Sequence, residues 1–218
     1  MAKKILNQQS QHWESSFSSK TEMFGNSPSP AAIEATSIFK KEGITDILEL
    51  GAGQGRDTIF FAKSGFKVQA IDYSKSAIDS IKRKAKASGL SQLVSAKLYD
   101  LRKPLPFDNE VFNGCFSHML YCMAFKKNEL VALSKEVWRV LKPKGLNIYT
   151  ARHTKDGDYK NGIYRGKDLY ENDGFIVHFF SKKKIKELSR GFKIIKIRHF
   201  EEGKFPRKLY EVVLEKKI

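Results

Sequence analysis

Three glycines and two acidic residues are spaced so that they could bind one polar small molecule. Glu49 precedes Gly51, Gly53 and Gly55, and Asp72 follows Gly51 by 21 residues. Glycine has no Cβ, so such a turn can take positive φ and let a ligand approach the backbone. One carboxylate can accept hydrogen bonds from two vicinal hydroxyls, and doubly wound folds place a ribose-binding acid at this spacing. The pattern therefore predicts a nucleoside-binding site.

A strand, a helix and a second strand are needed to position these residues. Residues 44–50 are apolar enough for a buried strand, residues 58–63 follow a helical pattern, and residues 67–71 form a second strand that ends in Asp72. The glycines then lie at a strand-to-helix junction. Arg56 stands where a dinucleotide-binding turn has its third glycine, so no pyrophosphate cradle is expected. The alternative is an ordinary turn, with Asp72 capping the next helix.

Residues 47–57 resemble motif I of the class I S-adenosylmethionine-dependent methyltransferases. Further segments support the resemblance in the expected order. Residues 99–101 (Tyr-Asp-Leu) are similar to the adenine-contacting acid and its neighbour, residues 104–117 to the approach to the fourth strand, and residues 136–146 to the following helix, Pro-Gly turn and fifth strand. The resemblance covers roughly residues 44–150. It implies an α/β fold, Rossmann-like, with a doubly wound, mostly parallel sheet and a C-terminal antiparallel hairpin.

Two segments resemble one branch of this superfamily, the thiopurine and tellurite-resistance methyltransferases. They are residues 51–57 with 65–72, and residues 202–213 near the C-terminus. That branch often carries a histidine-rich turn before its final strand, whereas this chain has Arg207 and Lys208 there. This departure leaves the methyl acceptor unassigned.

The resemblance implies S-adenosyl-L-methionine as the cofactor and S-adenosyl-L-homocysteine as its product. Asp72 is expected to bind the ribose, the backbone around Gly51 and Gly53 with Glu49 the amino acid moiety, and Asp100 the adenine amine. The predicted cofactor-binding residues are Glu49, Gly51, Ala52, Gly53, Arg56, Asp72, Tyr73, Asp100, Leu101, Ser117 and Trp13.

Three members of this set have an alternative role. Arg56 either lies near the cofactor carboxylate or is a solvated residue of the first helical turn. Tyr73 either flanks the adenine or only packs at a strand end. Trp13 either covers the cofactor or packs a helix onto the core.

The chain is predicted to be a single methyltransferase domain with two variable attachments. Residues 1–43 are expected to form a helical lid or cap, and residues 44–218 the S-adenosylmethionine-binding domain. Residues 152–180 are predicted to be a long loop that forms the substrate-side wall. Residues 192–199 and 208–215 alternate like the two strands of a closing hairpin.

Methyl transfer from a sulfonium is an in-line displacement, so alignment of the reactants can supply roughly 7 to 11 kcal/mol. His118 and Tyr121 follow the fourth strand and are candidates for positioning the acceptor, although His118 is also explained as a hydrogen-bonded structural residue. No catalytic base is identified. A thiol or chalcogen nucleophile needs little help from a base, so the missing base does not identify the acceptor. The predicted function is methylation of a small molecule, with a thiol or chalcogen nucleophile as the candidate acceptor.

The charge suggests an alternative. The chain has 40 basic and 24 acidic residues, for a net charge of +16, which is also expected of a tRNA or rRNA methyltransferase. Residues 182–184, with Lys142 and Lys144, would then contact phosphates. Lysine is nevertheless spread along the whole chain, and residues 117–120 (Ser-His-Met-Leu) do not match the Asn/Asp-Pro-Pro-aromatic motif of amino-directed nucleic-acid methyltransferases. A second alternative is a non-catalytic S-adenosylmethionine-binding protein.

Composition gives the remaining expectations. No apolar run is long enough for a membrane span, and the polar N-terminus is unlike a signal peptide, so a cytoplasmic protein is predicted. Cys115 and Cys122 cannot form a disulfide framework, and with the scattered histidines they do not form a zinc site. We expect reduced thiols, no metal, no membrane partner, and a monomer or weak homodimer.

Overall fold

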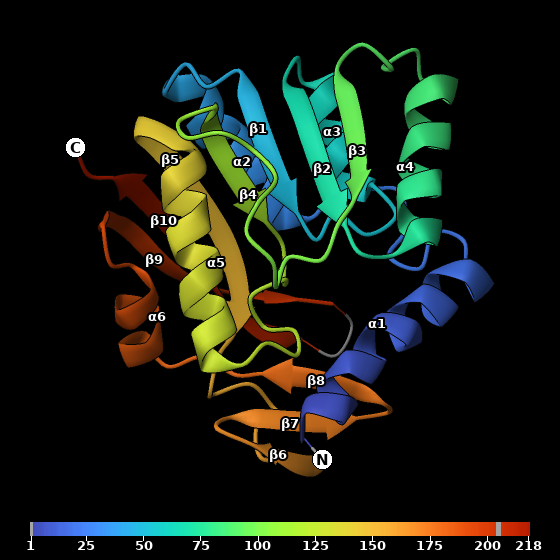
Figure 1. Cartoon of the computed structure of the whole chain (residues 1–218), viewed down its shortest axis with the longest axis vertical. Helices are drawn as coiled ribbons and strands as arrows, with labels where there is room; N and C mark the ends of the chain where they lie inside the picture. The colour runs from blue at the N-terminus through green and yellow to red at the C-terminus, as the bar shows by residue number, and fades with distance from the viewer. Residues whose placement is uncertain (1, 204–205) are drawn as a thin grey trace.

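A seven-stranded sheet forms the centre of the molecule in the computed structural model, which describes residues 2–203 and 206–218 (Figure 1). Its strand order is β3-β2-β1-β4-β5-β10-β9. The strands are β1 (Asp46–Leu50), β2 (Lys67–Asp72), β3 (Val94–Leu98), β4 (Phe112–Ser117), β5 (Leu141–Arg152), β9 (Phe192–Glu202) and β10 (Arg207–Lys216). Strands β1 to β5 are parallel, whereas β10 pairs antiparallel with both β5 and β9. The predicted fold class is confirmed.

Helices cover both faces of this sheet, because successive strand residues point to opposite faces. In β1, Leu48 and Leu50 join the core on the side of α5 and α6, and Ile47 joins the core on the side of α2 and α3. The helices are α1 (Ala2–Ser19), α2 (Pro30–Lys41), α3 (Arg56–Lys63), α4 (Lys75–Ala87), α5 (Lys127–Val140) and α6 (Lys182–Leu188). The strand order reverses between β1 and β4, so the carboxyl ends of these strands open a crevice of the kind that binds ligands in doubly wound folds.

A second sheet occupies the region that was predicted to be a long loop, and this prediction is wrong. It consists of β6 (Ile163–Gly166), β7 (Leu169–Asn172) and β8 (Phe175–His178), which pair antiparallel in that order. Two-residue turns at 167–168 and 173–174 connect the strands, and all four turn residues have positive φ. This is the hairpin geometry that Asp-Gly sequences favour.

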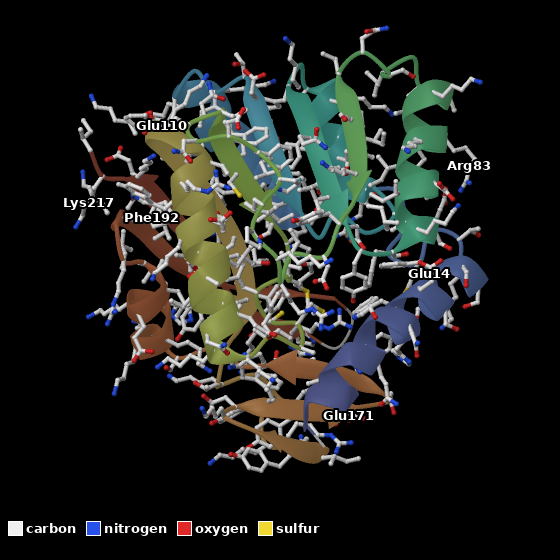
Figure 2. All side chains as sticks on the ribbon, viewed as in Figure 1. Glu14, Arg83, Glu110, Glu171, Phe192 and Lys217 are labelled. Atoms are coloured by element: carbon white, nitrogen blue, oxygen red, sulfur yellow. The ribbon has the colours of Figure 1, made fainter. Side chains whose placement is uncertain are left out.

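Helix α1 crosses the open end of the main sheet and touches α4 on one side and β8 on the other (Figure 1). Figure 2 places Glu14 where α1 passes beneath α4. Cys115 and Cys122 are buried as free thiols. Within residues 2–203 and 206–218, no helix has the length and apolar character needed to cross a membrane.

Candidate functional site

A cavity of about 430 Å³ lies between α1, the carboxyl ends of β1, β2 and β4, and the small sheet. Most of the residues predicted from the sequence line it. They are Trp13, Glu49, Gly51, Ala52, Gly53, Arg56, Asp72, Tyr73, Leu101 and His118. The strand-to-helix turn and the lid segment therefore meet in one place, as the sequence pattern requires.

The glycine turn is closely packed on its inner side. Gly51 has φ 68°, and a Cβ built on it would lie 2.7 Å from Cδ1 of Leu120. Gly53 has φ 53°, and a Cβ there would lie 3.5 Å from the ring of Phe17. Both positions have left-handed backbone, in which any side chain is strained, and at Gly51 the close neighbour Leu120 adds a steric clash. The backbone of the turn thus remains accessible from the cavity.

Asp72 is held by the backbone with its carboxylate facing the cavity. The N–H of Gly53 donates to Oδ2 and the N–H of Ser74 donates to Oδ1, both at 2.9 Å. Each carboxylate oxygen has a second lone pair, so both can accept one more hydrogen bond. Burial raises the pKa of Asp72 to about 6, although these backbone donors favour the ionised form. The group can accept a pair of hydroxyls when it is charged.

Glu49 lies deeper and is only 3% exposed. It accepts a hydrogen bond from the hydroxyl of Thr58. Burial and the neighbouring charge of Asp57 raise its pKa well above the usual range. Asp57 in turn accepts hydrogen bonds from the N–H and the hydroxyl of Ser29, at 2.7 and 2.8 Å, which ties the start of α2 to α3.

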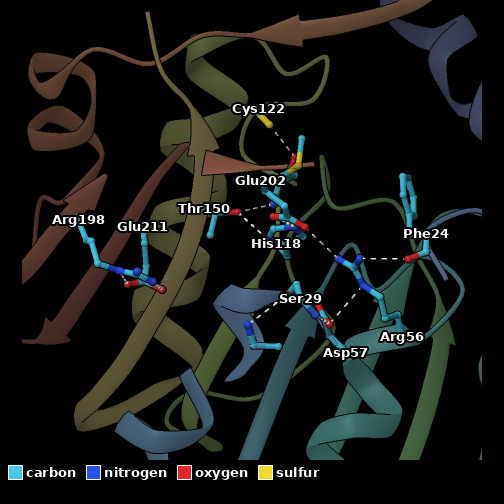
Figure 3. A network of polar contacts seen from close by, with 12 residues as sticks. Phe24, Ser29, Arg56, Asp57, His118, Cys122, Thr150, Arg198, Glu202 and Glu211 are labelled. Carbon is cyan, nitrogen blue, oxygen red and sulfur yellow. Dashed lines mark hydrogen bonds and ion pairs between the residues drawn. The ribbon is translucent and has the colours of Figure 1, made fainter. Parts of the chain in front are cut away.

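A chain of polar contacts links Arg56, Glu202, His118 and Thr150 beside the cavity (Figure 3). Arg56 donates to the carbonyl of Phe24 at 3.3 Å, and its Nη2 lies 3.9 Å from Oε1 of Glu202. Oε2 of Glu202 lies 3.2 Å from Nε2 of His118, whose Nδ1 lies 3.0 Å from Oγ1 of Thr150. Burial raises the pKa of Glu202, but His118, Arg56 and an arginine of β10 outweigh it, so the pKa is lowered. Glu202 is therefore an anion that joins the β9–β10 hairpin to Arg56 in α3 and to His118 after β4.

His118 lines the cavity, but both of its ring nitrogens already have partners. Oγ1 of Thr150 accepts a hydrogen bond from the backbone N–H of Met119 at 2.8 Å and also lies next to Nδ1 of His118. A carboxylate oxygen of Glu202 lies next to Nε2. Each ring nitrogen therefore has a protein oxygen atom within 3.2 Å. The structure contradicts the prediction for Tyr121, which is fully buried, stacks on Tyr149 with ring centroids 4.2 Å apart and does not line the cavity.

Two predicted cofactor-binding residues also lie outside the lining. The carboxylate of Asp100 is bound by Arg102, whose Nε and Nη2 donate at 2.9 and 2.8 Å. Ser117 is fully buried within the sheet. Lys204 and Phe205, which belong to the C-terminal resemblance, lie outside the described residues.

The sequence analysis did not name the other lining residues individually. They are Phe17, Met23, Phe24, Gly25, Gln54, Asp57, Met119, Leu120, Met123, Arg152, Asp158, Asn172, Asp173, Phe175, Ile176, Val177, Glu202 and Arg207. They come from six stretches of chain, two of which lie in the segment predicted to be the substrate-side wall. One local signal could have placed some of them more closely. This signal is the Asp173-Gly174 pair, which is typical of a hairpin turn and would have placed β7 and β8.

Comparison with known proteins supports a methyltransferase fold. Residues 47–145 match a family model described as "Methyltransferase domain". A curated relative from Bacillus subtilis (strain 168), named "Putative methyltransferase YqeM", is 31% identical over 106 residues, which are 47% of this chain and 40% of that protein. The chain thus spans less than half the length of this curated relative.

Solved structures extend the likeness to most of the chain. An S-adenosylmethionine-dependent methyltransferase of Methanosarcina mazei has a TM-score of 0.69 at 22% identity, covering 79% of this chain and 92% of that one. The 1,6-didemethyltoxoflavin-N1-methyltransferase of Burkholderia thailandensis, solved with S-adenosylhomocysteine, has 0.69 at 19%, covering 87% and 79%. TehB from Haemophilus influenzae has 0.69 at 18%, covering 94% and 67%. At these identities the likeness shows the fold.

Proposed function

We propose that this chain is a class I S-adenosylmethionine-dependent methyltransferase that methylates a small molecule with S-adenosyl-L-methionine as donor, as its methyltransferase-domain match and its fold support. One observation carries the proposal. One cavity is lined both by the glycine turn and Asp72 and by the apolar side chains of Phe24, Met119 and Phe175. Its volume of about 430 Å³ is in the range of small-molecule sites.

The residues present fit this cofactor. Asp72 has two lone pairs left for the two ribose hydroxyls, and Tyr73 and Leu101 offer apolar contact for the adenine. The backbone of the turn at Gly51 and Gly53 would bind the amino acid moiety, with Glu49 beneath it. Asp100 has no part in the proposal, because Arg102 occupies its carboxylate.

The bound cofactor supplies an electrophilic methyl group on a positively charged sulfur. The protein's contribution is to exclude water and to hold the acceptor in line with that group. Trp13 and Phe17 from α1 and Phe175 from β8 pack against one another over the cavity, with Trp13 ring centroids 5.3 Å from Phe17 and 4.7 Å from Phe175. Alignment in such a dry site is worth roughly 7 to 11 kcal/mol, without any proton transfer.

A soft acceptor, a thiol or another chalcogen nucleophile, fits the compartment best. Both ring nitrogens of His118 face protein oxygen atoms and Tyr121 is buried outside the cavity, so the proposal assigns no base to either residue. The side chains of Met23, Met119 and Met123 reach the cavity and make it polarisable and adaptable. An acceptor that reacts as an anion or a good neutral nucleophile needs no base.

The nucleic-acid alternative has less support. Acidic side chains, Asp158, Asp173 and Glu202 among them, outnumber arginines in the cavity lining, and this balance favours a small acceptor over a phosphate backbone. The exposed lysines 182 and 183 lie on α6, and neither lines the cavity.

The test is transfer of label from S-adenosylmethionine to a panel of thiols, chalcogen oxyanions, other metabolites, tRNA and rRNA. We expect transfer to a thiol or chalcogen compound, and much slower transfer with the Asp72→Ala variant at a cofactor concentration near the wild-type KM. Asp79→Ala is the matched control, because Asp79 is an exposed acid on α4 that pairs with Lys75. Label on RNA alone would contradict the acceptor proposal. Binding of the cofactor without transfer to any acceptor would favour a non-catalytic protein.

A further inference from the structure

Gln54 connects the glycine turn to α1 and to the segment after it. Both the nitrogen and the oxygen of its side-chain amide form hydrogen bonds there. Its Nε2 donates to the carbonyls of Phe17 at 3.1 Å and Lys20 at 2.7 Å. Its Oε1 accepts the N–H of Met23 at 2.8 Å. The side chain is 7% exposed and lies between Gly53 and Gly55 in the chain. Gln54 therefore donates hydrogen bonds to carbonyl groups at the end of α1 that have no partner within the helix.

Glu14 makes a second attachment on the same side. It accepts hydrogen bonds from the hydroxyls of Ser74 and Ser76, both at 2.6 Å, and from the N–H of Ser76 at 3.2 Å. These residues begin α4 directly after Asp72 and Tyr73. An acid at a helix N-terminus is stabilised by the helix dipole. Helix α1 is thus bound next to the proposed ribose site.

Gln9 makes a third attachment, on the opposite wall. Its Nε2 donates to the carbonyl of Gly174 at 2.8 Å, and its Oε1 accepts the N–H of Ile176 at 3.0 Å. Both partners belong to the β7–β8 hairpin, and Ile176 lines the acceptor side of the cavity. Helix α1 therefore joins the cofactor turn to the acceptor wall.

We propose that α1 couples the two halves of the cavity, with Gln54 as the positioning residue at the cofactor end and Gln9 at the acceptor end. A cofactor that orders the glycine turn also fixes Gln54, and α1 then holds β8 in place for the acceptor. The cofactor and the acceptor bind interdependently, because each stabilises the position of α1 that the other requires. By linkage, the effect is equal in both directions. This inference rests on the proposed function, since it takes the glycine turn to be the cofactor site.

The experiment uses the full chain and S-adenosylhomocysteine, so no acceptor is needed. Hydrogen–deuterium exchange is measured over residues 8–19 of α1 and residues 175–178 of β8, with and without the ligand. Calorimetry gives the affinity in parallel. The variants are Gln54→Ala, which cuts the link at the cofactor end, and Gln9→Ala, which cuts it at the acceptor end. Gln11→Ala is the matched control, because Gln11 is exposed on the same helix.

In the wild type and in Gln11→Ala we expect the ligand to slow exchange in both segments by roughly 5- to 10-fold, the low end of usual coupling. Gln54→Ala should bind the ligand more weakly by a similar factor and lose the protection of β8. Gln9→Ala should keep the protection of α1 and lose that of β8. If Gln54→Ala does not fold, Glu14→Gln, which keeps the shape of the side chain, weakens the second attachment at the cofactor end and should likewise reduce the protection of β8.

The possible failures are distinguishable. If the ligand binds the wild type but exchange in β8 does not respond, the coupling is wrong and the proposed cofactor site stands. If Gln54→Ala keeps both the affinity and the protection of β8, Gln54 is not the positioning residue and the inference is overturned. If calorimetry detects no binding to the wild type, the proposed function and the coupling both fail.

Discussion

The charge of Asp72 determines how tightly the proposed cofactor can bind. The carboxylate is 7% exposed, and its two backbone donors leave one lone pair on each oxygen for the ribose. Loss of a charged hydrogen-bond acceptor costs about 1.5 to 3 kcal/mol. We predict that Asp72→Ala weakens S-adenosylhomocysteine binding by roughly 10- to 100-fold in calorimetry, while Asp79→Ala binds as the wild type does. Equal affinity of the two variants would refute the ribose assignment.

The pH dependence of binding follows from the raised pKa of Asp72. Burial, with a smaller contribution from the nearby Glu14 carboxylate, moves this pKa to about 6 in the folded protein. Ribose hydroxyls donate to the ionised form, so binding should weaken as pH falls through 6. At one pH unit below this value we predict roughly tenfold weaker binding. Asp72→Asn should be weak and flat with pH, and a flat profile in the wild type would contradict the assignment.

A side chain at Gly53 would enter the space of the ligand. The backbone there has φ 53°, and a Cβ would already lie 3.5 Å from Phe17. We predict that Gly53→Val binds S-adenosylhomocysteine at least as weakly as Asp72→Ala, because strain and a steric clash add. Calorimetry on a variant shown to be folded checks this. Affinity equal to that of the wild type would move the cofactor site away from the turn.

The positions of some site residues could be predicted from the sequence, whereas the contacts of others could not. The glycines and Asp72 were predictable because their spacing along β1, α3 and β2 fixes their position in space. Asp100 was predicted at the right strand end, but the adjacent Arg102 competes for its carboxylate. Tyr121 follows β4 as expected, yet its ring turns inward onto Tyr149. Side-chain direction depends on packing that no local pattern encodes.

At the level of elements, the parallel core was predictable and its attachments were less so. Apolar strands alternating with helical patterns indicate a doubly wound sheet, and the order of the segments gave the topology. The region from 152 to 180 has few apolar residues in regular alternation, so it resembled a loop. Its three short strands depend on two tight turns, at 167–168 and 173–174, and on packing against α1. These are long-range conditions.

A buried polar cluster fixes the small sheet to α6 and makes it sensitive to acid. Lys184 donates to Nε2 of His178 at 2.7 Å, to Asp168 at 2.9 Å and to the carbonyl of Phe179 at 2.9 Å. His178 Nδ1 lies 3.1 Å from the carbonyl of Phe125 and is its donor in this network. Burial and the Lys184 charge lower the pKa of His178 to about 4. The folded protein therefore holds His178 neutral.

The sign of the acid effect follows from that lowered pKa. The unfolded chain binds a proton at His178 below pH 6.5, whereas the folded chain resists it until about pH 4. Stability from this group is therefore present above pH 6.5 and is lost as pH falls toward 4. We predict a loss of roughly 3 kcal/mol in the free energy of unfolding from this residue, measured by urea titration. The loss should be smaller in His178→Gln, and identical pH slopes would exclude the mechanism.

At the level of the whole molecule, the surface and the cavity differ in charge. The chain carries a net charge of +16, yet acidic side chains outnumber arginines in the cavity lining. Exposed lysines occur on α2, α4, α5 and α6 and in the β5 region, so they are spread over separate parts of the molecule. A dispersed positive surface keeps a protein in solution and attracts polyanions weakly, whereas a nucleic-acid site concentrates basic residues around the reacting centre.

Salt dependence therefore separates the acceptor classes. An RNA acceptor bound through about six phosphates would lose roughly 10³-fold in affinity between 50 and 200 mM salt, because condensed counterions are released. A small acceptor enclosed between α1 and β8 releases no such counterions. We predict that the kcat/KM for a small thiol or chalcogen acceptor changes less than about threefold over this range, measured with labelled S-adenosylmethionine. Two results together would overturn the small-molecule proposal: transfer to tRNA or rRNA that falls steeply as salt rises, and no transfer to small acceptors at any salt concentration. They would show that the positive surface binds the RNA acceptor. The cofactor site at Asp72 would be unaffected by that result.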